Sequence, residues 1–593
     1  MGWFVGKIAS PQCLLQLPPE GSHPVLIARR LLMLGSLLQG IPPFSIGKLA
    51  GLTADYHAIM FRAVHTATRH VTSDDELVGS LDGIECLMIE SMYLNNAGNL
   101  RRAWITNRRA MVMAQMMGLH RGARSSSVIL EPGTWDRIDP DYMWFRLVCT
   151  DRYLSLMLGL PQGSLENAFA THAALRSCAA VERMERMESV AAGLIIQRNS
   201  AERTDLAATY KIDRMLQEAA ALMPPQWWLM AAGDTATASN DAKAFEESIR
   251  LMLQFTHRHL LVQLHLPYMM QSSITDTRYD YSKMTAANAS RAIVAQFVAF
   301  RGTRPATAYC RGIDFIVFIA STTLCIAHIE ARRQQQSTGL SKGLTVFQSL
   351  QHQRLSDRGL LERTLEIMES ETLQSHDVIA QEISSILKPL LAVENNSAGG
   401  RLYQTSASLD ESPGKQESRY LSSEGGDVDE LRIHIPYYGT IKIEYNPTRP
   451  AAILEPVQVP TAEEWLRNAS TSSGATDSSS LVGLCEPAVS PLNREQRQKE
   501  KGKETASAAP RPAGYEISAA QPVNPDWQAV PSYLDSPDPL QQPGSAGWDR
   551  SLSSFDVGGG QDDVNGLLVP GLGADVDDWA LQGVDLALFS NIT

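Results

Sequence analysis

Cysteine, histidine and clustered acidic residues are the side chains of this chain that could bind a metal or do chemistry. The 593-residue chain has seven cysteines, at positions 13, 86, 149, 178, 310, 325 and 485. None lies within a few residues of another, so the closely spaced pair that a local zinc site needs is missing. Their scatter and odd number are typical of a protein from a reducing compartment.

Two apolar-periodic stretches carry three histidines each: His57, His65 and His70, and His257, His259 and His265. In the first stretch the histidines are expected on the polar face of a helix. In the second, His257 and His265 share a face, but eight residues of helix separate them by about 12 Å. One metal ion cannot bridge that distance directly, so we predict that these histidines are structural.

No Walker loop, no H-E-x-x-H motif and no G-x-G-x-x-G after a strand is present. The paired carboxylates Asp74-Asp75 and Asp562-Asp563 fall in expected loops or tails, where nothing would shift their pKa values for acid–base work. We therefore predict that the chain is not an enzyme. A helical enzyme with an unrecognised site is the alternative.

The composition predicts one large core with tails. Hydrophobic residues make up 44% and charged residues 20% of the chain, and the formal net charge is −13. An acidic chain does not attract nucleic acid over its whole surface, so DNA contact would need a local patch or a separate module.

The elements that would position any site are helices. The apolar period predicts one helix from Leu81 to Leu94 and a second from Arg101 to Gly118. A third begins after Asp139, with Pro140 at its first position, and ends at Gly159. Asp151 and Arg152 lie inside this apolar helix, and we expect a structural ion pair because unpaired buried charges are costly.

Two arginine pairs, Arg101-Arg102 and Arg108-Arg109, stand a heptad apart beside Trp104. They could form a phosphate-binding patch. We instead expect a solvated helix face, because a DNA-reading element is normally supported by further basic residues nearby.

Several of these residues carry a family resemblance: Trp104, Gly118, His120, Arg121, Trp144, Asp151 and Arg152, together with Ser155 and Gly159-Leu160-Pro161. Their order and spacing resemble the middle homology region of fungal zinc-cluster transcription factors. Similar phrases occur at 23–29, 264–269 and 309–315, so the resemblance covers 24–391. It implies a large helical regulatory domain.

The DNA-reading module of that family is an N-terminal cluster of six cysteines that holds two zinc ions. This chain contains no such cluster. We therefore expect no cofactor here, and zinc only if a cysteine cluster precedes Met1. Otherwise the protein regulates without contacting DNA itself, as relatives that lack the cluster look like modulators of secondary-metabolite gene clusters.

The fold class that we predict is all-α, with a small β-hairpin and a long disordered C-terminal region. The expected parts are a leader (1–23), the helical domain (24–391), a linker (392–430), a β-hairpin segment (431–467), a low-complexity region (468–549) and an acidic-hydrophobic segment (550–593). The apolar run 315–329 is shorter than the roughly twenty residues of a membrane span. It is expected to be the central core helix.

Two tail segments predict how the protein acts. The basic residues Arg494, Arg497, Lys499, Lys501 and Lys503 favour nuclear import, although interleaved glutamates also fit a plain solvated segment. Near the end, aspartates alternate with large apolar residues, as in activation segments that fold on a coactivator. The residues expected in the coactivator groove are Trp579, Leu581, Val584, Leu588 and Phe589. A tail helix packed on its own domain is the alternative.

Together these features predict a nuclear transcriptional regulator of a metabolic or secondary-metabolite pathway. Its expected partners are coactivators, and DNA either indirectly or through a missing N-terminal module. A small-molecule effector held among the helices and a homodimer are further partners that this interpretation allows, and no membrane is expected. A protein-interaction scaffold that does not bind DNA is the other alternative.

Overall fold

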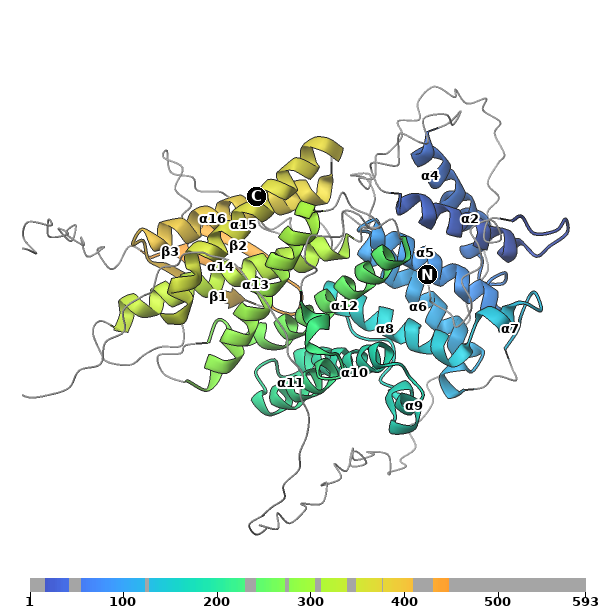
Figure 1. Ribbon diagram of the computed structural model, residues 1–593, viewed down its shortest axis with the longest axis horizontal. Helices are drawn as coiled ribbons and strands as arrows, with labels where there is room; N and C mark the ends of the chain where they lie inside the picture. Colours follow the sequence, from blue (N-terminus) through green and yellow to red (C-terminus); the bar gives the residue numbers. More distant parts are fainter. Residues whose placement is uncertain are drawn as a thin grey trace, which may run out of the picture. The chain divides into compact units, whose positions relative to one another are not determined.

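The computed structural model describes residues 16–41, 55–122, 127–229, 241–271, 277–303, 311–338, 348–375, 377–408 and 430–446. They form mainly helices: α2 (Pro24–Gln39), α4 (Tyr56–Ala67), α5 (Leu81–Asn96), α6 (Leu100–Met116), α7 (Thr134–Arg137), α8 (Pro140–Leu158), α9 (His172–Arg176), α10 (Ala180–Ala201), α11 (Leu206–Ala220), α12 (Asp241–His265), α13 (Asp280–Thr303), α14 (Gly312–Thr338), α15 (Gln348–Ser375) and α16 (Val378–Ala398). Figure 1 shows their arrangement. The predicted all-α class is confirmed.

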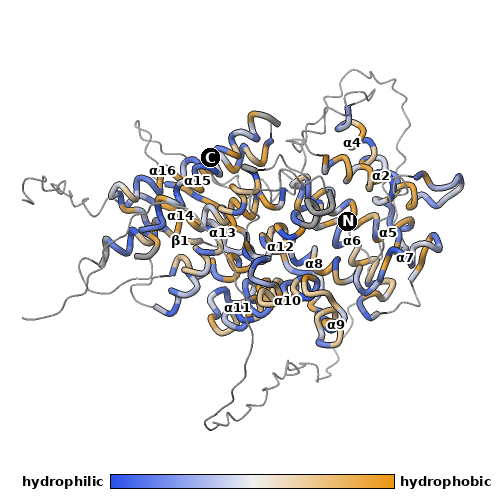
Figure 2. Tube along the Cα trace, in the orientation of Figure 1, coloured by the Kyte–Doolittle hydropathy of each residue, from blue (hydrophilic) through white to orange (hydrophobic). Residues whose placement is uncertain are grey.

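Local sequence signals set the ends of these helices. The Asp139 side chain accepts a hydrogen bond from the amide of Asp141 at 3.0 Å and caps α8, as predicted. Gly159 ends α8 in the left-handed conformation, with φ 70°. Figure 2 shows polar and apolar residues alternating along the helices, as expected when one side of each helix is buried.

The N-terminal helices pack in a chain of neighbours. Helix α2 contacts α4 and α5, α5 contacts α6, and α6 contacts α8. Their apolar side chains form two clusters, one around Val25, Leu32 and Cys86 and one around Leu81, Phe145 and Val148. These clusters are separate from the largest core cluster, which forms around α14.

Helix α14 lies at the centre of that largest cluster and contacts α12, α13, α15 and α16. Its residues 312–335 are long and apolar enough to cross a membrane, yet the most apolar stretch is completely buried by other helices. The prediction of a central core helix is confirmed, and the helix extends beyond the predicted run 315–329 at both ends.

The structure differs from the predicted boundary at residue 391. Helix α16 continues to Ala398 with Pro389 inside it. Strand β1 (Tyr403–Ser408) follows within the segment predicted as a linker, and it pairs with β3 (Gly439–Tyr445), which also pairs with β2 (Glu430–Ile435). The predicted hairpin is therefore present as β2–β3, and it forms part of an antiparallel sheet of order β1-β3-β2. Strand β1 contacts α14, and the third strand and the helices supply the support that a two-stranded hairpin lacks in water.

Candidate functional site

The family-like residues of α6 and α8 form a polar network. The Trp104 indole donates a hydrogen bond to Ser155 Oγ at 3.0 Å, and Ser155 donates to the carbonyl of Pro161 at 3.2 Å. The Arg108 guanidinium lies 4.5 Å from the centre of the Trp104 ring and forms an ion pair with Asp151. This network fixes the chain where it leaves α8.

Asp151 and Arg152 are both buried, and each has its own partners. The expected structural ion pair forms between Asp151 and Arg108. Asp151 pairs with Arg108 and accepts a hydrogen bond from the Gly163 amide at 2.6 Å. Burial raises the pKa of Asp151, while the Gly163 amide and Arg108 oppose this effect. Arg152 donates to Gln162, Asn167 and the Ser189 carbonyl at 2.8–2.9 Å. Burial lowers the pKa of Arg152 to about 10.

The prediction that the arginine pairs form a solvated face is wrong for Arg108. This side chain is engaged with the buried Asp151, and the neighbouring Arg109 pairs with Asp75 at 2.6 Å. The two guanidinium groups are held by carboxylates of the same chain, which leaves them poorly suited to bind phosphate. The periodicity of α6 could not reveal these partners, because they lie 43 and 34 residues away in sequence.

Three of the remaining family-like residues, Gly118, His120 and Arg121, follow the C-terminal end of α6, and the fourth, Trp144, lies in α8. Gly118 follows α6 with a φ of 77°, which favours glycine. The His120 ring lies 6.0 Å from the ring of the buried Trp144, and Arg121 is exposed. These residues determine how the segment after α6 packs on α8, so the motif divides into two structural clusters.

The tip of the β2–β3 hairpin docks beside the polar network of Trp104, Ser155 and Asp151, at the end of α8. The Tyr437 hydroxyl donates a hydrogen bond to the carbonyl of Leu160, and the Tyr438 hydroxyl donates to the carbonyl of Gln263. Pro436 lies so close to Gly159 that an added Cβ would be 3.2 Å from the proline ring. The hairpin thereby joins the ends of α8 and α12, a contact that spacing in the sequence could not predict.

The histidines of α12 have structural environments. His257 Nδ1 lies 2.8 Å from Glu188, and His265 Nε2 lies 3.2 Å from Asp213. His259 is 1% exposed, and its burial lowers the pKa to about 4, so the ring is neutral. Within the described ranges, no group of three or more His, Cys, Asp or Glu side chains is placed to hold a metal ion.

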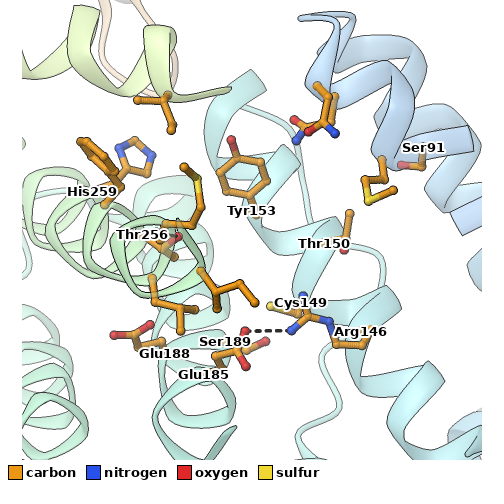
Figure 3. Close-up of a pocket in the computed structure, with 18 of the residues that line it drawn as sticks. Ser91, Arg146, Cys149, Thr150, Tyr153, Glu185, Glu188, Ser189, Thr256 and His259 are labelled. Atoms are coloured by element: carbon orange, nitrogen blue, oxygen red, sulfur yellow. Dashed lines mark hydrogen bonds and ion pairs between the residues drawn. The ribbon is translucent and has the colours of Figure 1, made fainter. Parts of the chain in front are cut away.

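A cavity of about 520 Å³ lies between the helices. Residues of α2, α5, α6, α8, α10, α12 and α14 line it, and Figure 3 shows Ser91 on one wall, Thr256 and His259 on the opposite wall, and Thr150 and Tyr153 between them. The sequence predicts an effector among the helices, but it identifies no residue of the binding site. The lining could not be predicted, because it depends on how seven helices pack.

The ionisable groups of this cavity have partners or are neutral. Arg146 pairs with Glu185 at 2.8 Å, and Figure 3 shows this contact on the cavity wall. Burial raises the pKa of the Tyr142 hydroxyl and of the Cys149 thiol, so both stay protonated at neutral pH. The cavity is therefore suited to uncharged molecules rather than to ions.

The tail residues predicted for nuclear import and coactivator binding lie outside the described residues, which end at 446. Their assignments stay predictions. The same holds for the C-terminal region predicted to be disordered.

Comparison with known proteins supplies the identity of the family. No family model matches the chain, and no solved structure matches it.

The chain is 32% identical over 597 residues to the dehydrocurvularin biosynthesis regulator of Aspergillus terreus, a match that covers 99% of this chain and 74% of the relative. It is also 32% identical over 595 residues to the transcription factor sdnS of Sordaria araneosa, covering 99% of this chain and 70% of that protein. A second dehydrocurvularin biosynthesis regulator, from Alternaria cinerariae, is 36% identical over 74% of this chain and 55% of its own length. The chain therefore belongs to the family of fungal transcription factors that includes these proteins.

Proposed function

We propose that this chain is a transcriptional regulator that controls the genes of a fungal secondary-metabolite pathway. The observation that carries the proposal is the match over 99% of the chain to a named biosynthesis regulator. In this proposal the helical domain is the regulatory part, and the acidic-hydrophobic segment 550–593 recruits coactivators in the nucleus. DNA contact is indirect or uses a module outside this sequence.

A non-enzymatic role fits the polar groups described above. Asp151, Arg152 and the α12 histidines are held by partners within the fold, an arrangement typical of structural networks. Ser341 stands in a G-x-S-x-G spacing, between Gly339 and Gly343. A nucleophile elbow joins a strand to a helix, whereas the element before Gly339 is helix α14. The spacing alone therefore does not indicate a hydrolase.

The activation segment can be tested by attaching residues 550–593 to a heterologous DNA-binding domain upstream of a reporter gene. We expect activation, and we expect the double change Trp579→Ala and Phe589→Ala to remove most of it. Burying each large apolar side chain in a coactivator groove contributes roughly 1.5–3 kcal/mol. The control Asp577→Asn should reduce output only slightly, because an exposed charge contributes roughly 0–1 kcal/mol. An inactive fusion, or a fully active double variant, would show that this segment has another role.

A further inference from the structure

The cavity lies between helices that have different main packing partners. Helix α5 packs mainly on α2 and α6, whereas α12 packs mainly on α13, α11 and α10. Both α5 and α12 line the cavity, together with α2, α6, α8, α10 and α14. Figure 3 shows Ser91 of α5 and Thr256 of α12 on opposite sides of the open space. A molecule in the cavity would therefore touch both α5 and α12 at once.

The size and the walls of the cavity suit a small organic molecule. Its volume of about 520 Å³ is in the range of drug-sized ligand sites. Met88 and Met92 of α5 and Met252 of α12 line it. Methionine side chains are flexible and polarisable, so such walls adapt to the shape of an apolar ligand.

The charges of the cavity select against an ionic ligand. The two acidic side chains of the wall are both engaged: Glu185 pairs with Arg146, and Glu188 lies within hydrogen-bond distance of His257 Nδ1 at 2.8 Å. A charged molecule would lose its hydration without gaining a free counter-charge, which is costly. Thr150 and Tyr153 of α8 and Asn96 of α5 are only partly buried and supply hydroxyl and amide groups for hydrogen bonds.

We propose that this cavity binds an uncharged, mainly apolar small molecule that carries a few hydroxyl or carbonyl groups, and that its binding ties α5 to α12. The ligand would act as an effector because it stabilises one packing of these two helices over others. The regulatory meaning of this binding rests on the proposed function. The binding itself is a property of the described helices and can be measured apart from transcription.

The test uses the full 593-residue chain and two naphthalene dyes of similar size, the neutral ketone prodan and the anionic 1-anilinonaphthalene-8-sulfonate. We expect saturable binding of prodan from its fluorescence, and binding of the anion that is weaker by about tenfold or more. Hydrogen exchange should slow in both α5 and α12 when prodan is bound. Equal binding of the two dyes, or slowing in neither helix, would overturn the proposal.

A matched pair of variants locates the bound dye. Thr256 lines the cavity and donates a hydrogen bond to the Met252 carbonyl at 3.0 Å. Thr285 of α13 makes the same bond to the Tyr281 carbonyl at 2.9 Å, away from the cavity lining. Thr256→Phe fills the cavity and should weaken prodan binding about tenfold or more, whereas Thr285→Phe should leave it unchanged.

If circular dichroism shows that Thr256→Phe is unfolded, Thr150→Leu fills the cavity from α8 and replaces it in the comparison. Prodan binding that is unaffected by a folded cavity-filling variant would contradict the assigned site. A chain that binds prodan as expected but fails to regulate transcription would keep this inference and refute the proposed function. A chain that regulates transcription but binds no neutral dye would support the proposed function and refute this inference.

Discussion

At the scale of single residues, the burial of its partner decides how much a charged side chain contributes to the stability of the folded protein. Arg108 and Arg109 are neighbours on α6, and sequence periodicity placed both on a solvated face. The partner of Arg108 is Asp151, whose side chain is fully buried, whereas the partner of Arg109 is Asp75, whose side chain is 64% exposed. The place of Asp151 inside an apolar helix predicts that its carboxylate needs a partner. The sequence does not identify Arg108 as that partner, because the contact depends on how α6 packs against α8.

This difference predicts unequal effects of two identical substitutions. Arg108→Met leaves a buried carboxylate without its counter-charge and should destabilise the folded protein by roughly 3 kcal/mol. Arg109→Met breaks an exposed ion pair and should cost about 1 kcal/mol or less. Chemical denaturation followed by circular dichroism measures both free energies of unfolding. Equal losses would mean that Asp151 does not depend on Arg108.

His259 predicts a pH dependence of stability. Burial lowers its pKa from 6.5 to about 4 in the folded protein. Below pH 6.5 the unfolded chain therefore binds a proton at this residue that the folded protein does not bind until about pH 4. The corresponding stability is complete above pH 6.5 and is lost as the pH falls to about 4, a loss of roughly 3 kcal/mol at about 1.36 kcal/mol per pKa unit.

The measurement compares unfolding free energies of wild type and His259→Phe across this pH window. The variant keeps a ring but cannot be protonated, so its stability should fall less steeply toward pH 4. The exposed His172→Phe serves as the control and should follow the wild-type curve. Parallel curves for wild type and His259→Phe would show that this ring is not the group that titrates.

At the scale of secondary-structure elements, the sequence predicted the helices better than the sheet. The helix ends follow from local signals such as Asp139, Pro140 and Gly159. Strand β1 is rich in polar residues, and its order comes from pairing with β3, whose residues lie more than thirty positions later, Tyr403 opposite Tyr445. Local composition therefore indicated a linker where pairing at long range produces a strand.

The docked hairpin predicts an unequal response of two glycines that share a left-handed backbone. Gly159 has φ 70°, and an added Cβ would lie 3.2 Å from Pro436, whereas Gly21 has φ 82° and nothing within 4 Å. Alanine at either position is strained in the left-handed backbone conformation and should lower the free energy of unfolding by roughly 1–2 kcal/mol. The added methyl group of Gly159→Ala also crowds the hairpin, so this variant should lose at least about 1 kcal/mol more. Thermal and chemical denaturation test this, and equal losses would argue against docking of the hairpin tip at Gly159.

At the scale of the whole molecule, a helical domain carries the family resemblance and contains a cavity, and an acidic-hydrophobic segment follows later in the sequence. Residues such as Trp104 and Asp151 carry the family resemblance, because their order and spacing along α6 and α8 can be read directly from a single sequence. The effector site could not be found in that way. Its lining comes from seven helices, from Ser36 to Ile316, and none of them shows it by its own pattern.

The central claim is that this chain regulates transcription of a biosynthetic pathway. The most direct test deletes the gene in the fungus that encodes it, restores either the wild-type gene or the Trp579→Ala, Phe589→Ala double variant, and sequences the transcripts. We predict that transcripts of a set of neighbouring biosynthetic genes fall in the deletion strain, recover with wild type and stay low with the double variant. Unchanged transcripts in the deletion strain would contradict the account.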